Sequence, residues 1–152
     1  MSKVIAFGFF LLFLAAIAFV SLKGMRPVAE LSASNEITGI SWQPLSIGGD
    51  PIAVGSAMRL QFGLDGKLTG HSGCNGFSGD YSRDAESVEI GPLGATRMAC
   101  PDRETTLENR FFDALQRTVT AESRAGRLIL SDADGKVLAV LKQATPEKVE
   151  ES

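Results

Sequence analysis

Histidine and cysteine are scarce in this sequence, which excludes most metal-binding and redox arrangements. The 152-residue chain contains one histidine, His71, and two cysteines, Cys74 and Cys100. A structural zinc site is built from two arms of closely spaced ligands, and only His71 and Cys74 form such an arm. The cysteines are too far apart for the Cys-x-x-Cys motif of redox proteins. We therefore expect no metal site, no cofactor and no redox centre.

Motifs for nucleophilic catalysis and phosphate binding are also missing. Ser72 follows His71, but neighbouring side chains on a strand point to opposite faces, and no nucleophile elbow surrounds the serine. No Lys-Ser or Lys-Thr pair of a phosphate-binding loop follows the regularly spaced glycines Gly70, Gly73, Gly76 and Gly79. The sequence predicts a protein that is not an enzyme. An unrecognised hydrolase that uses His71 or Arg97 is the alternative.

Positive charge is neither abundant nor clustered. The chain has 15 Lys and Arg against 18 Asp and Glu, which gives a formal net charge of −3. Binding to a phosphate backbone depends on clustered Lys and Arg side chains. We therefore expect no nucleic-acid partner.

The N-terminal segment lacks charge instead. The 19 residues from Val4 to Leu22 are uncharged, and a helix of that length spans about 28 Å, close to the ~30 Å hydrocarbon core of a bilayer. We predict a signal-anchor that holds the chain in a membrane through residues 4–22. A cleaved signal peptide, with Ala16-Ile17-Ala18 as the cleavage site, is the alternative. Lys3 lies on one side and Lys23 on the other, so charge does not decide the orientation.

The remaining chain reads as one domain with a short extension at each end. We expect residues 1–22 to be the anchor or signal, 23–36 a linker, 37–142 the domain and 143–152 a polar, disordered tail. Strict alternation over Ala57–Phe62 and the turn at Asp65-Gly66 predict a hairpin. Short strands are expected around Trp42 and at 69–82, 87–90, 118–123, 127–130 and 136–141.

One soluble helix is expected at 102–117. Its apolar side chains, Leu107, Phe111, Ala114 and Leu115, form a single stripe, and Asp102 is the expected cap. The order of these elements, with strands before and after a single helix, predicts an α+β fold. Its sheet is expected to be a small, antiparallel, partly open β-barrel with the helix packed on it.

The central motifs resemble those of the META domain family, which includes the HslJ heat-shock protein. Its residues are Gly-Cys-Asn at 73–75, followed by Phe77, Gly79 and Tyr81, and then Thr96, Arg97, Met98 and Cys100. The resemblance covers about residues 36–142. It implies a small β-barrel with a helix, a bacterial envelope protein linked to stress response, and no established catalytic activity. Lipoprotein members carry a cysteine after the apolar segment, and this chain lacks one there.

The resemblance, with the apolar segment, predicts a non-enzymatic envelope domain that binds an unknown envelope protein or an apolar ligand. The expected role of this domain is to support stress response, assembly or secretion. The alternative is a purely structural, membrane-anchored accessory module. The domain is expected in the periplasm or outside the cell, either anchored or, after signal cleavage, released to the periplasm.

Three side-chain arrangements follow from this reading. An even number of cysteines in an exported domain favours a disulfide between Cys74 and Cys100, and a pair of buried thiols is the alternative. Arg97 is expected to pair with an acid such as Asp65 or Asp80. An apolar binding groove is expected to be lined by the aromatic residues Trp42, Phe62, Phe77 and Tyr81.

Overall fold

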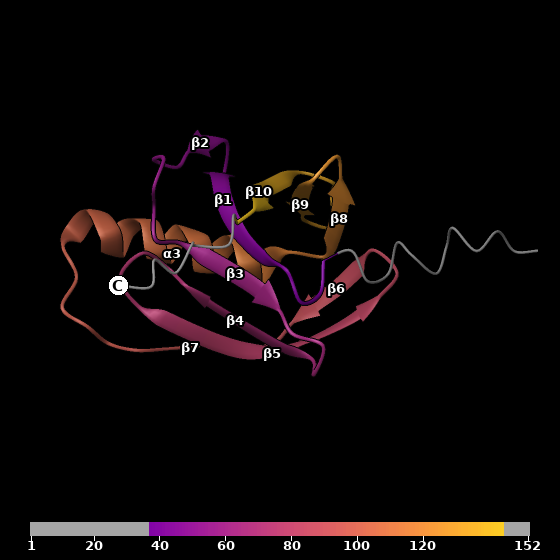
Figure 1. Ribbon diagram of the computed structural model, residues 1–152, viewed down its shortest axis with the longest axis horizontal. Coiled ribbons are helices and arrows are strands. Elements are labelled where there is room, and N and C mark those ends of the chain that lie inside the picture. The colour runs from indigo at the N-terminus through magenta and orange to yellow at the C-terminus, as the bar shows by residue number, and fades with distance from the viewer. Residues whose placement is uncertain (1–36, 145–152) are drawn as a thin grey trace, which may run out of the picture. The chain divides into compact units, whose positions relative to one another are not determined.

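The computed structural model describes residues 37–144, which form ten strands and one helix (Figure 1). The predicted anchor, linker and the tail beyond Ala144 lie outside the described residues. Among the described residues no helix is long and apolar enough to span a bilayer. The elements are β1 (Ser41–Ile47), β2 (Asp50–Pro51), β3 (Arg59–Phe62), β4 (Lys67–His71), β5 (Gly76–Asp84), β6 (Ser87–Ile90), β7 (Gly94–Ala95), α3 (Asp102–Arg117), β8 (Thr120–Arg124), β9 (Arg127–Ser131) and β10 (Val137–Gln143).

Eight of the strands form a closed ring. They follow the order β10-β9-β8-β6-β5-β4-β3-β1, and β10 pairs with β1 to close it, while β2 and β7 lie outside the ring. All of these pairings are antiparallel. The predicted antiparallel α+β barrel is therefore confirmed, but the expectation that it is partly open is wrong.

Closure depends on how β1 pairs at its two edges. β1 pairs with β10 from Trp42 to Ile47, and a register shift between Pro44 and Ser46 marks a bulge. A bulge bends a strand and increases its twist, which helps a sheet to close. The shortest strand pairing in the ring is between β6 and β8, where only Ser87 and Thr120 are in register. Two backbone bonds, from Val88 to Val119 and from Ala121 to Glu86, support it.

The alternating side chains fill the interior of the barrel. Met58, Leu60 and Phe62 are fully buried, as the period of two predicts. In β10 a register shift between Val137 and Ala139 interrupts the alternation. Leu138 and Ala139 are therefore both buried, although they are neighbours in sequence, whereas Val137 is 45% exposed.

The helix α3 has the bounds that the sequence predicts and buries Phe111, Ala114 and Leu115. It contacts β1, β9 and β10, and the ring of Phe111 packs against Phe77 on β5, with centroids 5.8 Å apart. Because β5 and β10 lie on opposite sides of the ring, α3 closes one end of the barrel. The predicted cap is wrong, because Pro101 occupies the N-cap position and Asp102 is the first helical residue.

Two motif glycines on adjacent strands differ sharply in the space around them. A Cβ atom added to Gly70 would overlap the carbonyl oxygen of Arg59 and the ring of Phe77. At Gly76, which pairs with His71 in the same hairpin, the nearest atom would be 4.0 Å away. Gly70 is therefore required by close packing of the strands.

We expect Gly70→Ala to lower the free energy of unfolding by about 1–3 kcal/mol, because the added methyl group forces backbone and ring apart. Gly76→Ala is the matched control and should change it by less than about 1 kcal/mol. Urea unfolding of both variants measures the difference. Equal losses at the two positions would contradict the packing argument.

Candidate functional site

The family motif forms a polar cluster around the buried Asn75, here called the Asn75 cluster: Ser72, Asn75, Thr96, Cys100 and Glu108. The side-chain oxygen of Asn75 accepts hydrogen bonds from Thr96 Oγ1 and from the backbone N–H of Met98, each at 2.9 Å. Its amide nitrogen donates to Glu108 Oε1 at 3.2 Å and to Cys100 Sγ at 3.3 Å. Every hydrogen-bonding direction of this buried amide is used.

Ser72 ties the same cluster to the helix. Its hydroxyl bonds to Glu108 Oε2 and lies 3.0 Å from the carbonyl oxygen of Asn75. A hydroxyl has one proton, and the Asn75 carbonyl already accepts from the backbone N–H of Ser72 at 2.8 Å. The hydroxyl therefore donates to Glu108 and accepts from the Asn75 N–H. Glu108, which the sequence places on the polar side of the helix, thus joins α3 to the loop before β5.

The two cysteines complete this connection. Cys74 and Cys100 form a disulfide, with Cα atoms 6.1 Å apart, and the described residues contain no free cysteine. The bond joins the loop before β5 to the segment that enters α3, as predicted. The Asn75 cluster and the disulfide therefore fasten the same two segments, which marks them as architectural.

His71 and Ser72 do not form a catalytic pair. Nδ1 of His71 accepts a hydrogen bond from the backbone N–H of Gly73 at 3.1 Å, whereas the Ser72 hydroxyl is held by Glu108 and Asn75. Ser72 is also 1% exposed. His71 is therefore not the general base of this serine, and the buried hydroxyl has no access to a substrate.

Arg97 does not form the ion pair that the sequence predicts. Its side chain is exposed, and no ion pair involves it within residues 37–144. Asp80 pairs instead with Lys67, and the hydrogen bond and charge of Asp80 raise the pKa of that ammonium group. Asp65 accepts a hydrogen bond from the backbone N–H of Lys67 in the turn.

The predicted aromatic groove is wrong, because its residues lie in the core. Trp42 and Phe62 are 0% exposed and Phe77 is 5% exposed. The indole N–H of Trp42 donates to the carbonyl of Ile37. Tyr81 is half-buried, packs edge-on against Phe62 and donates its hydroxyl to Gly63. Alternation identified the correct face, but that face is enclosed by the ring and by α3.

A hollow that the sequence did not indicate lies where α3 meets the barrel, here called the α3 pocket. It encloses about 320 Å³. Its walls come from three separate segments: Ile47 and Gly48 at the end of β1, the helix from Asn109 to Arg117, and the turn and start of β10 from Lys136 to Leu138. Ile47, Ala114, Val137 and Leu138 make the apolar part, while Arg110, Arg117 and Lys136 bring three positive charges.

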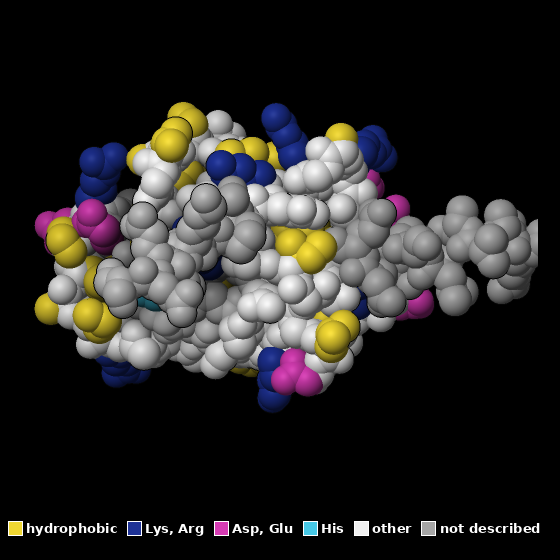
Figure 2. Space-filling model, in the orientation of Figure 1, with side chains coloured by type: hydrophobic (Ala, Val, Ile, Leu, Met, Phe, Trp, Pro, Cys, Tyr) yellow, Lys and Arg dark blue, Asp and Glu magenta, His cyan; other side chains and the backbone are white. Residues whose placement is uncertain are grey.

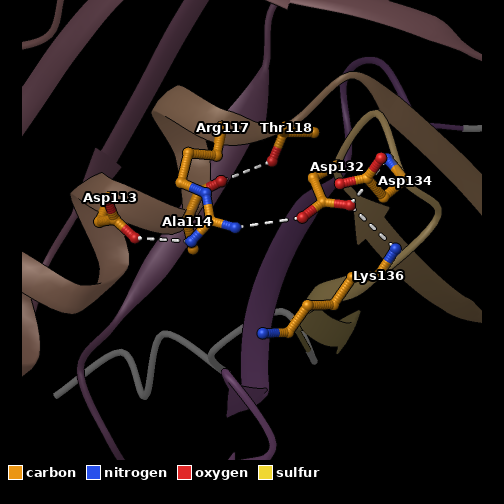
Figure 3. A network of polar contacts seen from close by, with 7 residues as sticks. All are labelled: Asp113, Ala114, Arg117, Thr118, Asp132, Asp134 and Lys136. Carbon is orange, nitrogen blue, oxygen red and sulfur yellow. Dashed lines mark hydrogen bonds and ion pairs between the residues drawn. The ribbon is translucent and has the colours of Figure 1, made fainter.

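Arg117 is held between two carboxylates at one side of the pocket (Figure 3). Its guanidinium lies 3.4 Å from Asp113 and 3.1 Å from Asp132. The backbone N–H of Lys136, with smaller effects from the N–H of Asp134 and from Arg117, lowers the pKa of Asp132. A lowered pKa means that this carboxylate stabilises the fold above its ordinary pKa and loses that effect as the pH falls through the lowered value. The pair is therefore intact at neutral and mildly acidic pH.

The other two cations differ in how firmly they are held. Arg110 donates to the carbonyl of Ile47 at 2.8 Å and pairs with Asp50 at 2.5 Å. Lys136 is exposed, and no ion pair involves its ammonium within residues 37–144. Its side chain extends away from the turn that carries Asp132 and Asp134 (Figure 3). Elsewhere on the visible described surface both signs of charge are scattered (Figure 2).

One sequence signal could have indicated this pocket, although we made no prediction from it. Arg103, Arg110 and Arg117 recur every seven residues, which is nearly two helical turns, so they share one face of α3. Arg103 lines a neighbouring hollow of about 340 Å³, with Arg110 between the two. The segments of β1 and β10 that lie opposite these arginines are distant from them in sequence. No sequence pattern indicated that they would lie beside the helix.

Comparison with known proteins places this fold. The chain is similar to an NMR structure of a protein from Burkholderia xenovorans, at 29% identity and a TM-score of 0.55, over 75% of this chain and 88% of that one. A second NMR structure matches at 21% identity and a TM-score of 0.57, over 72% and 92%.

A crystal structure of a DUF4847 family protein from Bacteroides vulgatus ATCC 8482 matches at 16% identity and a TM-score of 0.55, over 73% of this chain and 96% of that one. It shares the fold alone. No curated protein matches the sequence. The family model described as META domain matches residues 35–145, which include all of the described residues 37–144. The chain belongs to the META domain family.

Proposed function

We propose that this protein is a non-enzymatic binding domain of the bacterial envelope, and that the α3 pocket is its binding site. The observation that carries the proposal is the pocket itself. It is formed by residues of the helix and of two barrel strands, and apolar side chains make much of its wall. Pockets with apolar walls and a few polar groups are the usual sites for small ligands. The ligand is apolar in its main part, and binding serves envelope support under stress.

The disulfide supports the envelope location. Disulfides persist in oxidising compartments and are rare in the cytosol, and Cys74 and Cys100 are joined in this domain. The uncharged segment at residues 4–22 has the length of a membrane anchor. We propose that this anchor holds the domain on the periplasmic or outer side. Release to the periplasm after signal cleavage is the alternative.

A purely structural accessory module is the second candidate. The burial of Trp42 and Phe62 favours it, because the aromatic residues that resemble the family's are part of the core. Such a module would need no open pocket.

Filling the pocket distinguishes the two candidates. Val137 stands at the pocket with 45% of its surface exposed, and Val119 is 41% exposed but does not line the pocket. In cells that lack the chromosomal copy, we expect Val119→Trp to restore survival of envelope stress. Val137→Trp, at equal abundance, should fail because the indole occupies the site. Full rescue by Val137→Trp would overturn the binding proposal and favour the structural module.

A further inference from the structure

We propose that the α3 pocket binds a small molecule with an apolar body and a single anionic head group. This inference rests on the proposed binding function and specifies its ligand. Its first support is the division of the pocket wall. Ile47, Ala114, Val137 and Leu138 line the hollow with apolar groups, and Arg110, Arg117 and Lys136 line it with cationic side chains.

The arrangement of the carboxylates favours an anion inside the pocket. Asp50 and Asp132 bind the two guanidinium groups but do not line the pocket. Asp113 is the only acidic residue that the described wall contains, against three cations. The carboxylates fix the orientation of the arginines. Each guanidinium keeps further N–H donors, because Arg110 uses only Nη2 in its described bonds and Arg117 uses Nη1 and Nη2 but not Nε.

Lys136 supplies the most available charge. It is exposed, and within residues 37–144 no acid pairs with its ammonium. An arriving anion therefore does not have to displace a carboxylate from it. The turn beneath it is fixed, because Asp132 Oδ1 accepts hydrogen bonds from the backbone N–H groups of Asp134 and Lys136.

The two halves of the wall together restrict the class of ligand. A fully hydrated anion would lose water against the apolar side chains without compensation. An uncharged hydrocarbon would cover the Lys136 ammonium, which has no acidic partner within residues 37–144, without supplying one. A molecule with both parts satisfies each half. The head can be a carboxylate or a phosphate monoester, since both accept paired hydrogen bonds from guanidinium groups. The volume of about 320 Å³ limits the buried body to roughly the size of one ring or a short acyl chain.

Matched probes test the inference on the full chain in nanodiscs of zwitterionic lipid. Benzoate and phenyl phosphate carry ring and charge, benzamide keeps the ring without the charge, and acetate keeps the charge without the ring. In methyl and amide NMR titrations we expect benzoate or phenyl phosphate to shift Ala114, Val137 and Leu138 saturably. Benzamide and acetate should bind about tenfold more weakly or less. Whichever anionic ring compound binds more tightly identifies the head group.

Two lysine variants, one just before β10 and one within it, give the control. Lys136→Gln should weaken binding of the anionic ring compound about fivefold and leave benzamide unchanged. Lys142→Gln removes an exposed charge within β10 that does not line the pocket, and should change neither. Benzamide binding as tightly as benzoate, with no effect of Lys136→Gln, would overturn the anionic head group and leave the binding function standing. No saturable shift with any ring compound would also overturn the inference, whereas the binding function falls only if Val137→Trp rescues cells.

Discussion

Replacement of Asn75 by alanine is expected to lower the free energy of unfolding by about 3 kcal/mol or more. The substitution removes four side-chain hydrogen bonds at a site that is 4% exposed. The Met98 N–H and the Thr96 hydroxyl lose their acceptor, and Glu108 keeps only its bond to Ser72. A hydrogen bond contributes about 0.5–1.5 kcal/mol, so the loss of four gives about 3 kcal/mol, and more where a buried group is left unpaired. Chemical denaturation followed by tryptophan fluorescence measures the loss, because the single Trp42 lies in the core.

Asn109→Ala on the exposed side of α3 is the matched control and should stay within about 0.5 kcal/mol of the parent protein. A similar small change at Asn75 would show that solvent satisfies the cluster and that the amide does not hold the two segments together. Asn75→Asp provides a second check, since it keeps the two accepting positions but places a carboxylate beside Glu108. It should be less stable at neutral pH than at a pH where the pair shares a proton.

Removal of the disulfide is expected to cost about 3.5 kcal/mol. The Cys74–Cys100 bond spans 26 residues, and the chain-entropy argument for a loop of that length gives about this value. The measurement compares urea midpoints of the parent protein and of the variant with alanine at both positions. Mass spectrometry of the non-reduced parent confirms two protons fewer than in the reduced form.

The disulfide and Asn75 should also prove coupled. Both hold the segment before α3 to the loop before β5, and Asn75 donates to Cys100 Sγ itself. A variant that lacks all three side chains should therefore lose less stability than the sum of the separate losses, by about 1 kcal/mol or more. Strict additivity would mean that each constraint stabilises the fold independently.

Local patterns predicted the elements of this fold, but not how the ring closes. Alternation over Ala57–Phe62 and the apolar stripe of the helix depend on neighbours in sequence, and both elements formed as expected. Closure depends on the pairing of Trp42 with Gln143, at the two ends of the domain. No local feature of the sequence indicates the register of that pairing. The bulge at Pro44–Ser46, which bends β1, is visible only once β10 lies beside it.

The functional side chains were harder to predict for a related reason. The alternation of side chains along a strand indicated that Phe62 and Phe77 share the inner face. Whether this face is open depends on α3, because Phe111 and Phe112 of the helix pack on Phe77. The α3 pocket combines segments near Ile47, Arg110 and Val137. Only the seven-residue spacing of the arginines was visible in the sequence, and it marks one of the three walls, although no pocket was predicted from it.

The pairing of β1 with β10 also determines where the pocket lies. Ser41 and Ala144 lie beside each other at one end of this pair, since the N–H of Ala144 donates to the carbonyl of Ser41. The pocket lies at the opposite end of the same two strands, beyond Ile47 and Leu138. A strand of seven residues is about 23 Å long. The pocket and the contact between Ser41 and Ala144 are therefore separated by about the length of one strand.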